Sequence, residues 1–102
     1  MTLAAVMAAL SDPVRVFIVR SLAARGETTC GTLELGISKA TRSHHLKVLR
    51  EAGLTHTRAE GTHRYVSLRR EDVDARFPGL LGAVLAAAEA EAGAKTASAV
   101  PS

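Results

Sequence analysis

The chain has almost none of the residues that stabilise a small domain through covalent bonds or large aromatic side chains. Its 102 residues include one cysteine, no tryptophan, one tyrosine and two phenylalanines. A single cysteine excludes an internal disulfide, which is typical of proteins that fold in a reducing compartment. Apolar burial must come from leucine, valine, isoleucine and alanine, which favours one small domain of closely packed helices whose core a partner subunit completes.

Further absences narrow the class of protein. No apolar run approaches the length of a membrane span, and residues 1–10 lack the basic start and the length of a secretory signal, so we expect a cytoplasmic protein with no membrane partner. The sequence contains no glycine-rich phosphate loop, no nucleophile beside a base with a third orienting group, and no carboxylate pair facing a pocket. We therefore do not expect an enzyme.

Positive charge is concentrated in the middle of the chain. Residues 14–70 hold 11 lysines and arginines against 4 acidic residues, a net charge of +7, together with all four histidines. Residues 71–102 hold 2 basic and 5 acidic residues, a net charge of −3, and the whole chain carries +3. A concentrated positive field favours a polyanion as the partner.

Residues 38–54 predict a helix with one apolar and one basic face. Ser38 is a good helix cap, and Gly53 can adopt the left-handed conformation that ends a helix. The apolar stripe consists of Leu46, Val48 and Leu49. The opposite face carries cations and small hydrogen-bonding groups, namely Lys39, Arg42, Ser43, His44, Lys47 and Arg50. This face suits nucleic acid, although basic helix faces are also commonly just solvated.

The residues before this helix predict the remaining parts of a helix-turn-helix. Residues 28–35 favour a shorter helix, and Gly36 marks a tight turn between the two helices. Residues 13–25 predict a core helix that starts at an Asp-Pro pair and is so crowded with apolar side chains that most of its sides are expected to be buried. Residues 3–10 predict a short amphipathic helix.

The residues after the basic helix predict a hairpin and one more helix. Two strands are expected at residues 54–59 and 62–68, around a turn at Glu60 and Gly61. Residues 69–76 read as a connecting turn, and residues 77–92 as a last helix with an apolar stripe. Residues 93–102 are small and polar and are expected to form a disordered tail beyond the domain of residues 1–92.

The sequence is similar to one known family over most of the predicted domain. The run from Ser43 to Leu54, SHHLKVLREAGL, preceded by LSDPVR at residues 10–15 and followed by Glu60, Gly61 and Tyr65, resembles the ArsR/SmtB family of winged-helix repressors. The match extends from Leu10 to Leu68 in order and without large gaps. It implies a mainly α winged helix-turn-helix with a small β-hairpin, in the order α-α-α-α-β-β-α, that dimerises and represses transcription at a palindromic operator.

The resemblance also implies which residues contact double-stranded DNA. Base-facing positions map onto Lys39, Ala40, Ser43 and His44, whereas phosphate contacts are expected from Thr41, Arg42, Lys47 and Arg50. Arg42 departs from the family, which commonly has an aliphatic residue there. In the hairpin, or wing, the residues that can reach the minor groove or its phosphates are Arg58, Thr62, His63 and Arg64; a solvated surface is the alternative for these four.

The two terminal helices predict a homodimer interface. Their apolar stripes consist of Leu3, Val6, Met7 and Leu10 in the first helix, and of Phe77, Leu80, Leu81, Val84, Leu85 and Ala88 in the last. The resemblance implies that such helices pair with those of a symmetry mate. In the alternative, both helices fold back on their own domain.

Both metal sites that the resemblance implies lack their ligands here. A Cys-x-Cys pair is expected near residues 27–30, where this chain has only Cys30, and residues 77–92 contain no histidine for a site on the last helix. A nickel or zinc site built from His56 and His63 on the wing, or from dimer-related residues, stays an alternative, as does a separate effector-binding protein that supplies the response.

Cys30 and His45 each allow two interpretations. Cys30 is either a redox switch beside the DNA-binding helix or a small buried apolar residue. His45 lies on the inward side near Leu49, a position more typical of a hydrogen-bonded structural histidine than of a ligand. A different class of function, a winged-helix module that binds a partner protein through its apolar helices, is disfavoured by the basic charge of residues 38–70.

Overall fold

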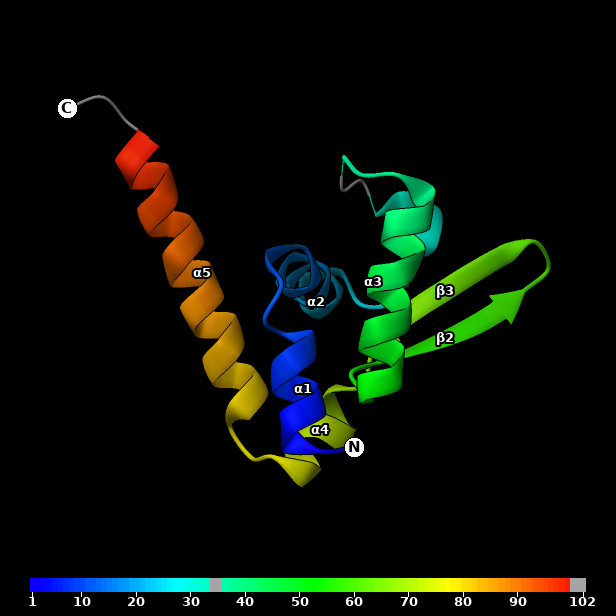
Figure 1. Cartoon of the computed structure of the whole chain (residues 1–102), viewed down its shortest axis with the longest axis horizontal. Coiled ribbons are helices and arrows are strands. Elements are labelled where there is room, and N and C mark those ends of the chain that lie inside the picture. The colour runs from blue at the N-terminus through cyan, green and yellow to red at the C-terminus, as the bar shows by residue number, and fades with distance from the viewer. Residues whose placement is uncertain (34–35, 100–102) are drawn as a thin grey trace.

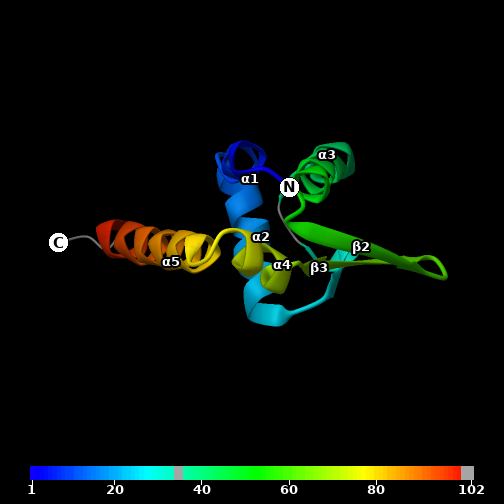
Figure 2. The ribbon, with the colours of Figure 1, turned by 90° about the horizontal axis from the view of Figure 1, so that it is seen from below.

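The backbone of residues 1–33 and 36–99 is described by a computed structural model, which is mainly helical with a small three-stranded sheet. The helices are α1 (Leu3–Ala9), α2 (Pro13–Arg25), α3 (Lys39–Ala52), α4 (Arg70–Arg76) and α5 (Leu80–Ala99), with a 3₁₀ turn η1 at Cys30–Thr32. The strands are β1 (Thr28–Thr29), β2 (Thr55–Glu60) and β3 (His63–Leu68). The hairpin of β2 and β3 and the helix α5 extend in opposite directions from the body (Figures 1 and 2). The predicted winged-helix architecture is confirmed.

The ends of α2 and α3 are determined by the capping residues that the sequence indicates. The side chain of Ser38 accepts a hydrogen bond from the N–H of Thr41 at 3.1 Å, and Gly53 ends α3 with a φ of 89°, in the left-handed region. Asp12 accepts hydrogen bonds from the N–H groups of Val14 at 2.8 Å and Arg15 at 3.3 Å. Burial alone raises the pKa of the Asp12 carboxyl, but these N–H groups, His45 and Arg15 lower it by more, so that it lies below its ordinary value.

The sheet has the order β1-β3-β2, so β3 of the wing is the middle strand of the sheet. Antiparallel pairing of β2 with β3 runs from Thr55 opposite Leu68 to Glu60 opposite His63. The wing therefore turns over two residues, the first of which is Gly61 with a φ of 60°, as a type II′ turn requires. This turn lies one residue after the predicted one, because β2 continues through Glu60. The strand β1 then pairs Thr28 with Val66 at the base of the wing.

The core is formed where α2 packs against α3 and β3. Its fully buried side chains include Ile18 and Leu22 from α2, Leu49 from α3 and Val66 from β3. The prediction that α2 is the core helix is confirmed for its inner side. Phe17, however, is 48% exposed, so one side of α2 faces outward with an aromatic ring.

Two predicted elements are wrong. Residues 28–35 do not form one helix, since Thr28–Thr29 is a strand paired with β3 and only Cys30–Thr32 is helical, while residues 34–35 lie outside the described residues. The β-branched threonines favour this extended pairing. Residues 70–76 form a helix instead of a connecting turn, with acidic residues in the first turn, where the helix dipole favours them.

The last helix also differs from its prediction. It starts at Leu80, because Phe77 caps α4 and Gly79 has a φ of 81°. It continues to Ala99, so the prediction of disorder is wrong for residues 93–99, whose alanine content favours a helix. Residues 100–102 of the predicted tail lie outside the described residues. No described helix is long and apolar enough to cross a membrane.

Candidate nucleic-acid interface

The outer face of α3 presents the polar side chains that the sequence assigns to DNA. On the inner face, His45, Leu46, Leu49 and Ala52 are buried. The exposed residues of the predicted set are Lys39, Ala40, Thr41, Ser43, His44, Lys47 and Arg50, and Arg42 is half-buried. The structure therefore brings the predicted residues together along one helix, whose buried side is held by the core. Lys47 lies 3.9 Å from Glu51, which partly neutralises its charge.

Arg15, which the sequence did not single out, contacts both α1 and α3. Nε of Arg15 donates to the carbonyl oxygen of Ala9 at 2.6 Å, and Nη2 lies 3.5 Å from that of Ala8. Nη1 lies 3.1 Å from Nδ1 of His45, which must accept the hydrogen bond because a guanidinium only donates. One side chain thus ties the C-terminal end of α1 to the middle of α3.

His45 is a structural residue in this arrangement. Its side chain is 8% exposed, and its bond to Arg15 gives the ring the partner that a buried polar group needs. The interpretation of His45 as a hydrogen-bonded structural histidine is confirmed. Its neighbour His44 is exposed on the outer face of α3.

Arg58 contributes to the position of the wing. Its guanidinium pairs with Glu27 at 2.7 Å and with Glu60, and it lies over the ring of Tyr65 at 4.6 Å. The hydrogen bond from Arg58 is the main reason that the pKa of Glu27 is lowered, and the same bonds raise the pKa of Arg58. Its guanidinium is therefore already shared between two carboxylates, which disfavours the predicted contact of Arg58 with a phosphate.

The tip of the wing remains accessible beside α3. Thr62, His63 and Arg64 are exposed, as the predicted DNA contacts require. These three residues line a cleft of about 660 Å³ that also contains residues of η1 and of α3. Cys30, a half-buried free thiol, lines the same cleft, so it is not a fully buried apolar residue.

The proposed pairing of His56 and His63 in a metal site is wrong within one chain. Glu60 lies opposite His63, and His56 is four residues before Glu60 on the same strand. At a rise of about 3.3 Å per residue the two histidines are therefore about 13 Å apart along the hairpin, with side chains that stand roughly parallel. Nitrogen atoms that share a zinc ion lie within about 4 Å of each other. Across the described residues, no group of three histidine, cysteine, aspartate or glutamate side chains is placed to hold a metal ion.

The predicted dimer residues divide into two groups. Val6 and Leu81 are fully buried in the core of their own chain, so the prediction that they contact a partner is wrong. Leu10, Phe77, Leu80 and Leu85 are half-buried against the same core. Leu3 and Met7, in contrast, are each 51% exposed, and Val84 and Ala88 are half-buried on α5.

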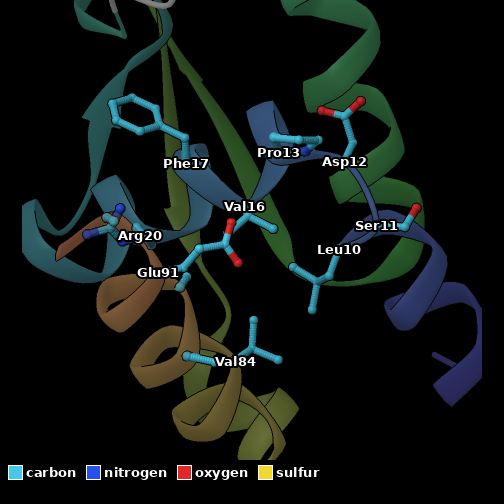
Figure 3. A pocket seen from close by; sticks show the side chains of 12 residues that line it. Leu10, Ser11, Asp12, Pro13, Val16, Phe17, Arg20, Val84 and Glu91 are labelled. Atoms are coloured by element: carbon cyan, nitrogen blue, oxygen red, sulfur yellow. The ribbon is translucent and has the colours of Figure 1, made fainter. Parts of the chain in front are cut away.

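An open apolar pocket separates α5 from α2. It has a volume of about 490 Å³, and its lining includes Val16 and Phe17 of α2 and Val84 and Ala88 of α5. Figure 3 shows the labelled side chains of Leu10, Val16 and Val84 around this space, with Arg20 to one side and the carboxylate of Glu91 reaching between Val16 and Val84. The exposure of Phe17 was missed because the residues next to it, Val16 and Ile18, are both apolar. A signal was present in the helical spacing, since Arg20 and Ser21 follow Phe17 at i+3 and i+4 and share its side of α2.

Comparison with known proteins gives matches to helix-turn-helix transcriptional regulators. A family model described as a helix-turn-helix domain matches residues 10–58. An HTH-type transcriptional regulator of Bacillus subtilis, YceK, is 44% identical over 81 residues, which cover 76% of this chain and 81% of that relative. The transcriptional repressor BigR from Xylella fastidiosa superposes with a TM-score of 0.60 at 32% identity, over 72% of this chain and 84% of BigR. The ArsR family transcriptional regulator RHA00566 superposes with a TM-score of 0.61 at 22% identity, over 96% of this chain and 93% of that one, a likeness in fold.

Proposed function

Because the chain belongs to the ArsR family of winged helix-turn-helix transcriptional regulators, we propose that it represses transcription in the cytoplasm by occupying a palindromic operator. It is a DNA-binding regulator and not an enzyme. The observation that carries the proposal is the outer face of α3, where exposed Ser43, His44, Lys47 and Arg50 lie opposite a side buried in the core. A helix presented in this way fits the major groove of B-DNA.

The side chains of α3 are assigned two kinds of contact. We assign base reading to Ser43 and His44, which can hydrogen-bond to base edges, and to Ala40, whose methyl can touch thymine. Arg50 is assigned to a phosphate, because it lies on α3 about two turns beyond Ser43 and about three turns from the N-terminal end, where helices of this type approach the bases.

Substitutions at these two kinds of position should differ in their effects. We expect His44→Ala to weaken operator binding by about 1 to 3 kcal/mol and to relax the preference at one base pair. Arg50→Ala should weaken all sequences alike and lower the slope of log K against log salt by about 0.9. Fluorescence anisotropy with the protein's own promoter and single-base variants, over a salt series, measures both quantities. A changed base preference in Arg50→Ala would contradict the assignment.

We further propose that the protein is a homodimer, paired through α1 and α5. Three large apolar side chains, Leu3, Met7 and Phe17, are about half exposed, and the pocket between α2 and α5 is open and mainly apolar. In Figure 1, α5 stands apart from the body on the side away from the wing, which leaves much of its surface uncovered. A second copy covers these surfaces and places two copies of α3 on two half-sites.

A charge introduced on α1 should break this dimer without unfolding the chain. We expect Met7→Glu to weaken dimerisation by at least about tenfold, because a buried unpaired carboxylate costs more than the corresponding 1.4 kcal/mol. Sedimentation velocity at micromolar concentration gives the mass of each species. Ala75→Glu, on the exposed surface of α4, is the matched control and should stay dimeric. A wild-type monomer at this concentration would refute the proposal.

One kind of sensor site, a metal site built from a pair of cysteines, can be excluded within one subunit. With a single cysteine in the chain, a site of two or three thiolates within one subunit is excluded, and we propose that the response does not use a Cys-pair metal site. Operator binding measured with nickel, zinc, cobalt and a chelator tests this. If binding is unchanged in all four, a separate effector-binding protein is the candidate, and it would copurify with the regulator.

A further inference from the structure

The cleft between α3 and the wing has three walls. One is the start of α3, the second is the wing tip, and the third is the segment Thr29–Gly31 of β1 and η1. The residues contributed by α3 are Lys39, Arg42, Ser43 and Leu46, which follow the spacing i, i+3, i+4 and i+7 and therefore share one flank of the helix. This flank is turned toward the wing, beside the outermost face that carries Ala40 and Lys47.

The cations of this cleft have no carboxylate partner within the part of the chain that the structure describes. Lys39, Arg42 and Arg64 line it, and among the described residues none of the three forms an ion pair with a carboxylate. Other cations of the middle segment, such as Arg58, Arg69 and Arg70, do form such pairs. The walls thus gather free positive charge in a hollow that also contains the hydroxyl groups of Ser43 and Thr62. Such a site suits an oxyanion.

The geometry of docking identifies the anion. If α3 lies in a major groove and the wing reaches the adjacent minor groove, the phosphate backbone of one strand must pass between them, because a backbone separates any two adjacent grooves. We propose that the cleft seats one phosphodiester of this backbone, clamped between Arg42 of α3 and Arg64 of the wing. This inference rests on the proposed DNA binding and names a contact within it.

The clamp explains why the chain has an arginine at position 42. Arg42 stands where the resembled family commonly has an aliphatic residue, and its half-buried position in the cleft lets a guanidinium form two parallel hydrogen bonds to a phosphate. Lys39, which the sequence assigns to a base, lies on the same flank and adds charge at the cleft instead. Cys30 then lies beside the bound backbone, although it makes no sequence-specific contact.

The first test uses the single thiol as a reporter of the cleft. Cys30 is the only cysteine, so reaction with a neutral aromatic disulfide reports on this site alone. We expect saturating operator DNA to slow the reaction by about tenfold or more, because thiol exchange requires access to the sulfur. Inorganic phosphate at the same ionic strength should slow it much less, since a lone ion lacks the neighbouring contacts of the duplex.

The second test removes the clamp. We expect the double variant Arg42→Ala/Arg64→Ala to lower the salt slope of operator binding by about 0.9, the value for one neutralised phosphate, and each single variant to lower it by less. All three should weaken all sequences equally and restore part of the thiol reaction in the presence of DNA. Arg42→Lys should keep the slope but recover only part of the affinity. Arg76→Ala, an exposed arginine on α4, removes the same charge away from the cleft and should change neither quantity.

The outcomes separate this inference from the proposed function. Operator binding that leaves the reactivity of Cys30 unchanged, or a slope of the double variant Arg42→Ala/Arg64→Ala equal to that of wild type, would overturn the clamp while DNA binding stands. Protection by inorganic phosphate but not by DNA would also overturn it, because the site would then take a free anion. Absence of any operator binding would overturn both proposals.

Discussion

Replacing Arg15 with methionine is expected to lower the free energy of unfolding by about 2 to 4 kcal/mol, a large part of the roughly 5 to 15 kcal/mol of a small domain. Methionine keeps the apolar stem but removes every donor. The carbonyl oxygens of Ala8 and Ala9 and Nδ1 of His45 then lose their charged partner. His45 is 8% exposed, so water replaces that partner poorly. Because Arg15 links α1 to α3, operator affinity should fall as well.

Urea unfolding followed by circular dichroism, at one protomer concentration, measures this loss. Arg25→Met is the matched control, because Arg25 is exposed in the last turn of the same helix, and it should cost less than about 0.5 kcal/mol. Arg15→Lys should recover only part of the stability, since an ammonium cannot reproduce the forked geometry. Equal losses in Arg15→Met and Arg25→Met would show that the hydrogen bonds of Arg15 do not stabilise the fold.

Leu49→Ala is expected to cost about 2 to 5 kcal/mol, since it removes buried methyl groups and leaves a cavity. Leu49 has 0% exposure and lies on the side of α3 opposite the DNA-facing residues, where α3 packs on the core. The substitution lowers the stability of the folded state without changing the surface exposed on unfolding. The urea midpoint should therefore fall while the m-value stays constant.

Val48→Ala provides the comparison for Leu49. Val48 is next to it on the same helix, packs only partly against the core, and should lose about 1 kcal/mol when shortened. Equal midpoints for the two variants would mean that the inner face of α3 is not the packed side. In that case the outer face assigned to DNA would also be incorrect.

The features that could be predicted from the sequence are those set by near neighbours. Ser38 and Gly53 bound α3 through hydrogen bonds and a left-handed conformation that are local to each end, and Asp12 caps α2 in the same way. The polar face of α3 follows from its apolar spacing alone. These local rules were sufficient to place most of the residues that we assign to DNA.

The features that were missed depend on residues distant in the chain. Thr28 is a strand residue only because Val66 pairs with it, and the hydrogen bond of Arg15 joins residues 30 positions apart. The third wall of the cleft exists for the same reason, since β1 brings Cys30 to the wing. Phe17 shows a different limit, because the run of adjacent apolar residues obscured the helical spacing, in which Arg20 and Ser21 lie on the same uncovered side of α2.

The pairing of β1 with β3 divides the chain into one closed segment and two segments outside it. Two residue pairs, Thr28 with Val66 and Thr29 with Tyr65, close a loop that contains η1, α3 and β2. Closing this long loop costs chain entropy, so we expect the pairing of β1 with β3 to form late. The hairpin of β2 and β3 is local and can form early. All residues that we assign to DNA lie inside this loop, and the apolar side chains that we assign to dimerisation lie outside it. Insertions or exchanges in α1 and α5 can therefore alter the choice of partner subunit while the closed segment that reads DNA stays the same.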